Sequence, residues 1–230
     1  MGSSYNPAIV TDGLVLCLDA ANQRSYPKSG TTWSDLIGGN DASMTNMDAS
    51  NFSPEHRGIL NFDGSDDYLT TTSSVGITGS SDRSLCVWFY HNSTSVDINI
   101  AGYGVNGGSA IFDIIARYAD GYHRAIGHFY GTDNNTISTL PSRNTINYLG
   151  WNYVCLTYTY NNASVYTNGK FSNSKALVLN TTDSTLKIGK ATYFPVDGFS
   201  GKIASVQLYN RALTADEVRQ NYEATVGRFS

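Results

Sequence analysis

Three aspartates, Asp63, Asp66 and Asp67, lie close together in the stretch LNFDGSDDYLTT, residues 60–71. Carboxylates at this spacing suit three kinds of chemistry. They ligate hard cations such as Ca²⁺, which takes roughly 6–8 oxygen atoms, or they act as acid and base in hydrolysis. They also close tight turns by accepting hydrogen bonds from the backbone two residues on. Gly64 directly after Asp63 favours the turn, and a calcium site is the second interpretation.

Hydrolysis needs two carboxyl groups that face each other. Retaining glycoside hydrolysis requires a separation of about 5 Å and inversion requires about 6.5–9.5 Å. The chain has only three glutamates, Glu55, Glu217 and Glu223, and none of them lies in an expected central strand. No expected strand carries two carboxylates at i, i+2 or i, i+4 in the apolar surroundings that raise one pKa. We therefore expect no catalytic residues and no enzyme.

Composition narrows the function classes further. The net charge is −4 and charged residues make up only 15% of the chain, without a cluster of Lys and Arg that would follow a phosphate backbone. No apolar run reaches the ~20 residues needed to cross a bilayer. The N-terminus has neither a basic nor an apolar segment of the kind found in signal peptides. The sequence thus predicts no nucleic-acid binding, no membrane insertion and no export signal.

The cysteines are odd in number, and each lies within an apolar run. Cys17, Cys86 and Cys155 occur in VLCLD, SLCVWF and YVCLT, with no C-x-x-C spacing that would indicate zinc. We expect three buried, reduced thiols that act as small hydrophobic side chains. This expectation agrees with synthesis in a reducing cytoplasm.

Short strand-like runs recur along the whole chain and are separated by turns rich in Gly, Asn and Asp. This pattern predicts an all-β sandwich, not alternating βαβ units. The run 151–160 carries apolar side chains on both faces, which indicates a central strand. Asn168 and Gly169 predict a type I′ hairpin, because Asn and Gly are the residues that take positive φ most readily. We expect one domain over residues 1–230, with residues 1–8 as a flexible arm. The expected strands lie within 14–20, 58–62, 67–71, 84–90, 110–118, 123–131, 151–160, 163–170, 185–190 and 201–210.

A short helix is expected near the end of the chain, in LTADEVRQNYEA. Thr214 and Glu217 form a capping box, and Leu213 with Val218 forms the hydrophobic staple that often accompanies it. Tyr222 follows Val218 by four residues and extends the same apolar face. The helix is expected to pack one side on the sandwich as a structural latch.

Five segments together resemble one superfamily, the laminin-G-like, concanavalin A-like lectin/glucanase domains. The resemblance spans roughly residues 10–225 and implies a two-sheet antiparallel jelly-roll sandwich with a short C-terminal α-helix. Relatives often bind Ca²⁺ at the rim, which implies Asp63, Asp66 and Asp67 as metal ligands here. The segments are LNFDGSDDYL (60–69), SLCVWFY (84–90), GWNYVCLTYTYNNASVYTNGK (150–170), LKIGK (186–190) and FSGKIASVQLYNRALTADEVRQNYEA (199–224).

Two departures from relatives bear on function. The glutamate pattern E-x-D-x-x-E of the superfamily's glycoside hydrolases is missing from this chain. The family's frequent I-D-E-V on the last strand reads Ile203-Ala204-Ser205-Val206, so two acidic groups are absent. Any role of those acids in relatives does not carry over.

The N-terminal segment 6–40 is similar to the openings of laminin-G-like virion proteins of tailed bacteriophages. This resemblance implies a protein made in the host cytoplasm, carried on the virion and extracellular after release. Capsid or tail proteins are then the implied partners, with a homo-oligomer as a further option.

The segment RYADGYHRAIGHFYGTDNN, residues 117–135, concentrates aromatic and hydrogen-bonding side chains. Aromatic rings stack on the C–H-rich faces of sugars while polar groups bond the hydroxyls, so this segment predicts a glycan site. The loop 191–198 is a further candidate. The candidate ligand-binding residues are Tyr118, Tyr122, Arg124, Phe129, Tyr130, Asp133 and Asn134, together with Trp33.

Two functions from different classes remain open. The first is a non-catalytic carbohydrate-binding adhesion module on a phage virion. The second is a structural decoration or assembly protein of the virion that has no sugar ligand. A glycoside hydrolase is the remaining alternative.

Overall fold

The computed structural model describes residues 7–92, 97–108, 110–119, 121–129, 136–138, 146–190, 192 and 198–229, without the side chains of 119 and 136–138. The α-helix in this part of the chain is α1, Ala215–Thr225. It is too short to span a bilayer, and no other described helix is long and apolar enough to do so. The strands are β1 Leu14–Asp19, β2 Thr32–Trp33, β3 Ala42–Thr45, β4 Phe52–Ser53, β5 Ile59–Asp63, β6 Tyr68–Ser74, β7 Arg83–His91, β8 Asp97–Gly104, β9 Ile111–Ala119, β10 Tyr122–His128, β11 Thr136–Ser138, β12 Gly150–Thr159, β13 Asn162–Thr167, β14 Lys170–Ala176, β15 Thr185–Ile188 and β16 Ser200–Tyr209.

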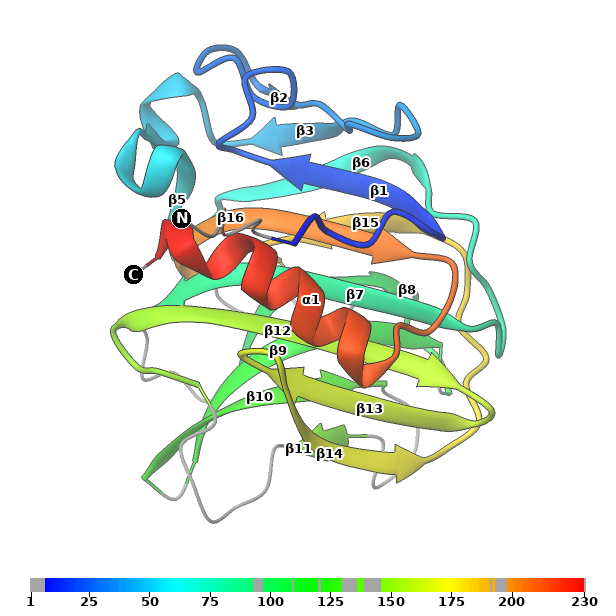
Figure 1. The fold of residues 1–230 in the computed structure, drawn as a ribbon. Coiled ribbons are helices and arrows are strands. Elements are labelled where there is room, and N and C mark those ends of the chain that lie inside the picture. Colours follow the sequence, from blue (N-terminus) through cyan, green and yellow to red (C-terminus); the bar gives the residue numbers. More distant parts are fainter. Residues whose placement is uncertain are drawn as a thin grey trace.

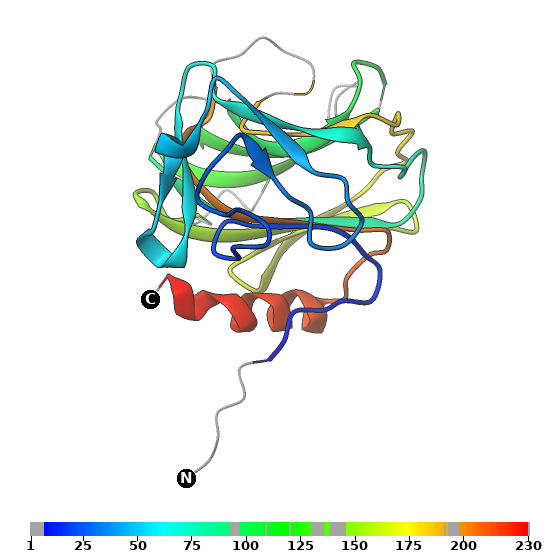
Figure 2. The ribbon, with the colours of Figure 1, turned by 90° about the horizontal axis from the view of Figure 1, so that it is seen from above.

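The strands form two antiparallel sheets that stack face to face (Figures 1 and 2). Sheet A has the order β14-β13-β12-β7-β16-β5-β4, and β1 also pairs with β16. Sheet B has the order β11-β10-β9-β8-β15-β6-β3-β2. The predicted fold class, a two-sheet jelly-roll sandwich closed by a short helix, is confirmed.

The strand β12 shows how the core is divided. Val154, Leu156 and Tyr158 belong to the core between the sheets, whereas Tyr153 and Cys155 belong to a second cluster on the outer face of sheet A. Because successive side chains alternate between faces, a strand covered on both sides is apolar throughout. The prediction for this run is confirmed except at Tyr160, which lies in the following turn with φ +49° and is 94% exposed.

The helix α1 covers the outer face of sheet A (Figures 1 and 2). Thr214 Oγ1 accepts from the Glu217 amide at 3.3 Å, and Glu217 Oε2 accepts from the Thr214 amide at 2.8 Å. Two hydrogen bonds from Arg211, at 2.8 and 2.7 Å, hold the pKa of Glu217 down at about 2. Val218 is buried beneath the helix, so the predicted cap and latch are confirmed.

The cysteine expectation is wrong for two of the three thiols. Cys86 and Cys155 lie directly opposite each other on β7 and β12 and form a disulfide, while Cys17 is free and buried. The expectation failed because sequence spacing does not reveal the register of two strands 69 residues apart. Since disulfides persist in oxidising environments, the cysteines no longer support synthesis in a reducing compartment.

Candidate functional site

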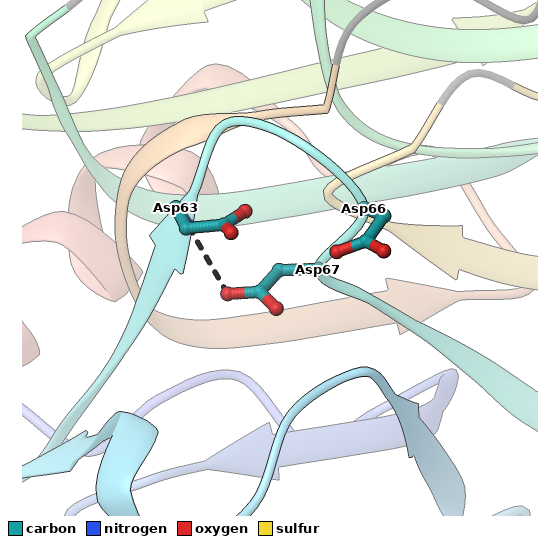
Figure 3. Close-up of side chains that lie close together, drawn as sticks. All are labelled: Asp63, Asp66 and Asp67. Atoms are coloured by element: carbon teal, nitrogen blue, oxygen red, sulfur yellow. Dashed lines mark hydrogen bonds between the residues drawn. The ribbon is translucent and has the colours of Figure 1, made fainter.

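The three aspartates form an acidic turn, residues 63–67, which joins β5 to β6 at the edge of the sandwich (Figure 3). One carboxylate oxygen from each of Asp63, Asp66 and Asp67 lies within 4.8 Å of the others. β5 ends at Asp63 and β6 begins at Tyr68, so the short connection itself brings the three groups together.

Hydrogen bonds within or next to the acidic turn hold two of its three carboxylates, those of Asp63 and Asp67, in place. Asp63 Oδ1 accepts from the Ser65 amide at 2.8 Å, which is the predicted bond to the backbone two residues on. Asp67 Oδ2 accepts from the Asp63 amide at 3.1 Å and from Asn51 Nδ2 at 3.0 Å. Gly64 has φ +87°, and a Cβ there would lie 2.8 Å from Ser200 Cβ. The predicted turn role is confirmed.

Electrostatics separate the third aspartate from the other two. Asp67 is only 4% exposed, and burial, followed by the charges of Asp63 and Asp66, raises its pKa despite its hydrogen bonds. Asp63 and Asp66 are exposed. In the described part of the chain, no donor contacts the Asp66 carboxylate. The turn therefore offers clustered carboxylate oxygens that repel one another, which is the environment that a hard cation neutralises.

Two of the predicted sugar-contacting rings are in the core. Trp33 and Phe129 are fully buried between the two sheets, so neither ring has a face free for a ligand, and both predictions are wrong. Phe129 continues the inward-facing set of β10, together with Ala125. Trp33 lies opposite Ala42, which is also part of this core.

The remaining predicted residues of segment 117–135 do not form a single cluster. Tyr122 and Arg124 share the outer face of sheet B, where the guanidinium lies 5.6 Å from the tyrosine ring centroid. Tyr122 is 37% exposed and Arg124 is buried. Tyr118 points to the other side of the hairpin and contacts His123 at 4.7 Å between ring centroids. Tyr130, Asp133 and Asn134 lie outside the described residues, as does most of the loop 191–198.

A buried carboxylate that we did not predict lies on the outer face of sheet B. Asp113 is fully buried, and its Oδ2 accepts from Thr192 Oγ1 at 2.8 Å and lies 3.9 Å from His128 Nδ1. A Cβ on Gly102 would lie 1.8 Å from Asp113 Oδ1, so only glycine leaves room for this carboxylate. Burial raises the pKa of Asp113. The sequence signal that could have identified this buried carboxylate is the single charged residue within the apolar run IFDII, residues 111–115.

Comparisons with known proteins agree with this architecture. A family model described as the concanavalin A-like lectin/glucanases superfamily matches residues 63–219. No curated protein sequence matches significantly. A sialidase structure from Trypanosoma rangeli is similar with a TM-score of 0.67 and 17% identity, over 97% of this chain and 34% of that chain. Domain 4 of AbnA, a GH43 extracellular arabinanase from Geobacillus stearothermophilus, in complex with arabinotriose, is similar with a TM-score of 0.64 and 12% identity.

The extent of each match differs. The sialidases are about three times longer than the matched region, since this chain spans 34% to 36% of their length. The arabinanase domain is matched over 98% of its length and over 91% of this chain. At these identities the likeness establishes a shared fold.

Proposed function

Because the chain belongs to the concanavalin A-like lectin/glucanases superfamily, we propose that it is a carbohydrate-binding adhesion module that does not cleave its ligand. The observation that carries the proposal is the correspondence, over nearly the full length of both, with an arabinanase domain whose structure holds arabinotriose. The matched arabinanase domain is about as long as this chain, so a chain of this length suffices as a binding unit. Two exposed tyrosines, Tyr122 on the outer face of sheet B at 37% and Tyr148 in the turn before β12 at 41%, offer the aromatic surface that sugar recognition needs.

The placement of carboxylates supports a role without catalysis. Asp113 and Asp97 both belong to the outer face of sheet B. Asp97 pairs with Arg117, which follows Asp113 by four residues along β9. At ~3.3 Å per residue the backbone positions of the two aspartates are about 13 Å apart along the strand, whereas the carboxyl groups of an inverting hydrolase lie ~6.5–9.5 Å apart. Asp97 is also held by Arg117, with Nη2 at 2.9 Å from Oδ2.

The acidic turn supports a different role from that of a hydrolase acid. Asp67 has the raised pKa that a general acid requires. However, Asp67 is only 4% exposed, and its Oδ2 accepts two hydrogen bonds that hold the turn, so the group is engaged in the fold.

We further propose that Asp63, Asp66 and Asp67 contribute ligands to one Ca²⁺ ion, with water completing the shell. The support is the 4.8 Å grouping of carboxylate oxygens and the unbonded carboxylate of Asp66. Calorimetric titration of the wild-type protein is expected to show binding and a raised melting temperature, and Asp66→Asn is expected to remove both. The Asp66 change leaves the hydrogen bonds of the turn intact. Absence of heat and of a melting shift in the wild type would refute the metal site.

The proposed location is the surface of a bacteriophage virion, and its support is the resemblance of segment 6–40 to virion protein openings. Purified particles are expected to retain the protein through density-gradient centrifugation, attached to capsid or tail proteins. Recovery only in the particle-free fraction would contradict this location and would leave the glycan proposal standing.

A glycan array tests the binding function directly. Wild-type protein is expected to show saturable binding to a restricted set of glycans that free sugar displaces. Tyr160→Ala is the matched control, because this tyrosine is 94% exposed and lies in the turn between β12 and β13. Absence of any saturable signal would refute the carbohydrate module and favour the structural decoration protein.

A further inference from the structure

The turn 147–150, which leads into β12, exposes two large side chains. Tyr148 is 41% exposed and Leu149 is 59% exposed. Leu149 also has φ +54°, a left-handed conformation that leucine rarely adopts. Backbone strain of this kind persists only where the surroundings enforce it, and it concentrates at functional sites. The sequence alone gave no reason to single out this turn.

The fully buried side chain of Asn152 holds the turn in place. Its Oδ1 accepts from the Asn147 amide at 2.6 Å, and its Nδ2 donates to the carbonyl oxygens of Asn147 and Gly150 at 2.9 Å each. The Leu149 amide donates to the His91 carbonyl at 2.8 Å. A Cβ on Gly150 would lie 2.8 Å from Asn147 Cβ, so the turn closes tightly. These contacts fix the shape of the turn without any ligand.

The ring of Tyr148 is fixed from behind by an imidazole. It stacks on His123 with 4.4 Å between centroids and 4° between the ring planes. His123 Nδ1 lies 3.1 Å from Nε2 of the buried His91, which links the stack to sheet A. His123 covers one face of the Tyr148 ring, and 41% of the Tyr148 surface remains exposed. A flat aromatic surface is thus held ready at the end of the sandwich.

The two histidines behind the Tyr148 ring are uncharged, which favours contact of the ring with the C–H groups of a sugar. Burial lowers the pKa of His123, and burial together with His123 lowers the pKa of His91 to about 4. Both imidazoles are therefore neutral at pH 7. Among the described residues, no Lys or Arg is placed over the Tyr148 ring to compete for its electron density.

We propose that Tyr148 and Leu149 form the stacking platform on which the glycan is bound. One sugar ring lies with its C–H-rich face on Tyr148, and Leu149 covers an adjacent edge of the saccharide. This inference rests on the proposed carbohydrate-binding function and assigns its site. One tyrosine and one leucine are far smaller than the ~800 Å² per partner of a stable protein–protein interface. The platform therefore matches a sugar ring better than a protein surface.

Matched variants test the platform by isothermal titration with arabinotriose and with each glycan that the wild type binds on the array. Tyr148→Ala is expected to weaken binding roughly tenfold or more, because the stacking surface is lost. Tyr148→Phe keeps the ring and is expected to bind within about twofold of wild type. Leu149→Gly relieves the positive φ, so it is expected to fold at least as stably and still to bind more weakly. Tyr160→Ala is expected to change nothing.

A second measurement needs no variant. When a sugar stacks on an aromatic ring, the ring current shifts the sugar protons over it to high field in the NMR spectrum. The wild type is expected to produce such shifts on one face of the bound sugar, and Tyr148→Phe is expected to retain them.

Two results would overturn the platform. Tyr148→Ala that binds as tightly as wild type, while Tyr122→Ala loses binding, would move the site to the outer face of sheet B and leave the carbohydrate function intact. Bound sugar without high-field shifts would likewise refute stacking on Tyr148. A wild type that binds no glycan would refute the function and the platform together.

Discussion

The outer faces of the two sheets are used differently. On sheet A, α1 and the C-terminal residues cover an apolar cluster in which the Trp88 ring lies 4.2 Å from that of Phe229 and 5.7 Å from that of Tyr222. On sheet B, the buried residues of the outer face mix polar side chains, namely Asp113, Arg124 and Asn99, with the apolar Ile111, Ile115 and Ile126.

The two outer faces differ in how far their buried side chains stabilise the fold. Burying apolar area stabilises a fold by roughly 25 cal/mol per Å², whereas burying polar groups costs free energy unless each group finds a partner. The face of sheet A thus serves the fold. The buried polar groups on the outer face of sheet B and the exposed side chains of the turn 147–150 are features that stability alone does not explain.

The largest expected effect is on the covered face of sheet A. Trp88 is 2% exposed, and its Nε1 donates to Thr225 Oγ1 at 2.7 Å. Trp88→Ala is expected to lower the free energy of unfolding by about 3–5 kcal/mol, since it leaves a large cavity under α1. Urea unfolding followed by circular dichroism measures the loss. A loss below about 1 kcal/mol would mean that this face does not serve as a second core.

A pH-dependent loss is expected where the two sheets meet at His91. Its pKa in the folded protein is about 4, below the ordinary 6.5, so only the unfolded chain takes up a proton between these values. Stability is therefore full above pH 6.5 and falls as the pH drops towards 4, by up to about 3 kcal/mol. His123, whose pKa is also lowered, adds to the loss in the same direction.

A variant isolates the contribution of His91 from that of the carboxylates. Unfolding free energies of wild type and His91→Gln are compared at pH 7 and pH 4.5. Between pH 7 and pH 4.5 the wild type is expected to lose more unfolding free energy than His91→Gln, because Gln has no proton to bind. Parallel pH profiles would show that His91 is not the titrating group.

The smallest expected change in the free energy of unfolding comes from substituting Asp113 on sheet B, and it is a gain where the others are losses. Burial raises the pKa of Asp113, so its ionised form costs stability, and this cost disappears as the pH falls and the carboxyl takes up a proton. Asp113→Asn keeps the shape without a charge, and it is expected to raise the free energy of unfolding by about 1 kcal/mol at alkaline pH, where the wild-type carboxyl is ionised. The gain is expected to vanish at low pH, where wild-type Asp113 is protonated. A clear loss of stability at alkaline pH would mean that the charge itself is stabilised.

Local signals in the sequence predicted much of this molecule. The capping box of Thr214 and Glu217, the hairpin at Asn168-Gly169 and the turn closed by Asp63 each depend on residues within a few positions of one another. Such interactions do not depend on how distant strands pair. The sandwich itself followed from strand-like runs and from the resemblance to one superfamily.

Features that depend on register or on tertiary burial were not predicted. The Cys86–Cys155 bond requires knowing which residues of β7 and β12 lie opposite each other. Trp33 and Phe129 looked like ligand contacts because the sequence does not say which face of a strand meets the core. Tyr148 gave no strand or motif signal, since its exposure follows from the hydrogen bonds of Asn152 to the turn.

The most direct test of the central claim, that this fold binds glycans without cleaving them, follows retention and product release in one experiment. Purified protein is incubated with immobilised and free glycans, including arabinotriose and a sialylated oligosaccharide, and reducing ends and free sialic acid are measured over a day. Saturable retention with no release above the protein-free control is the expected result. Release of sugar by the wild type, or no retention of any glycan, would contradict the account.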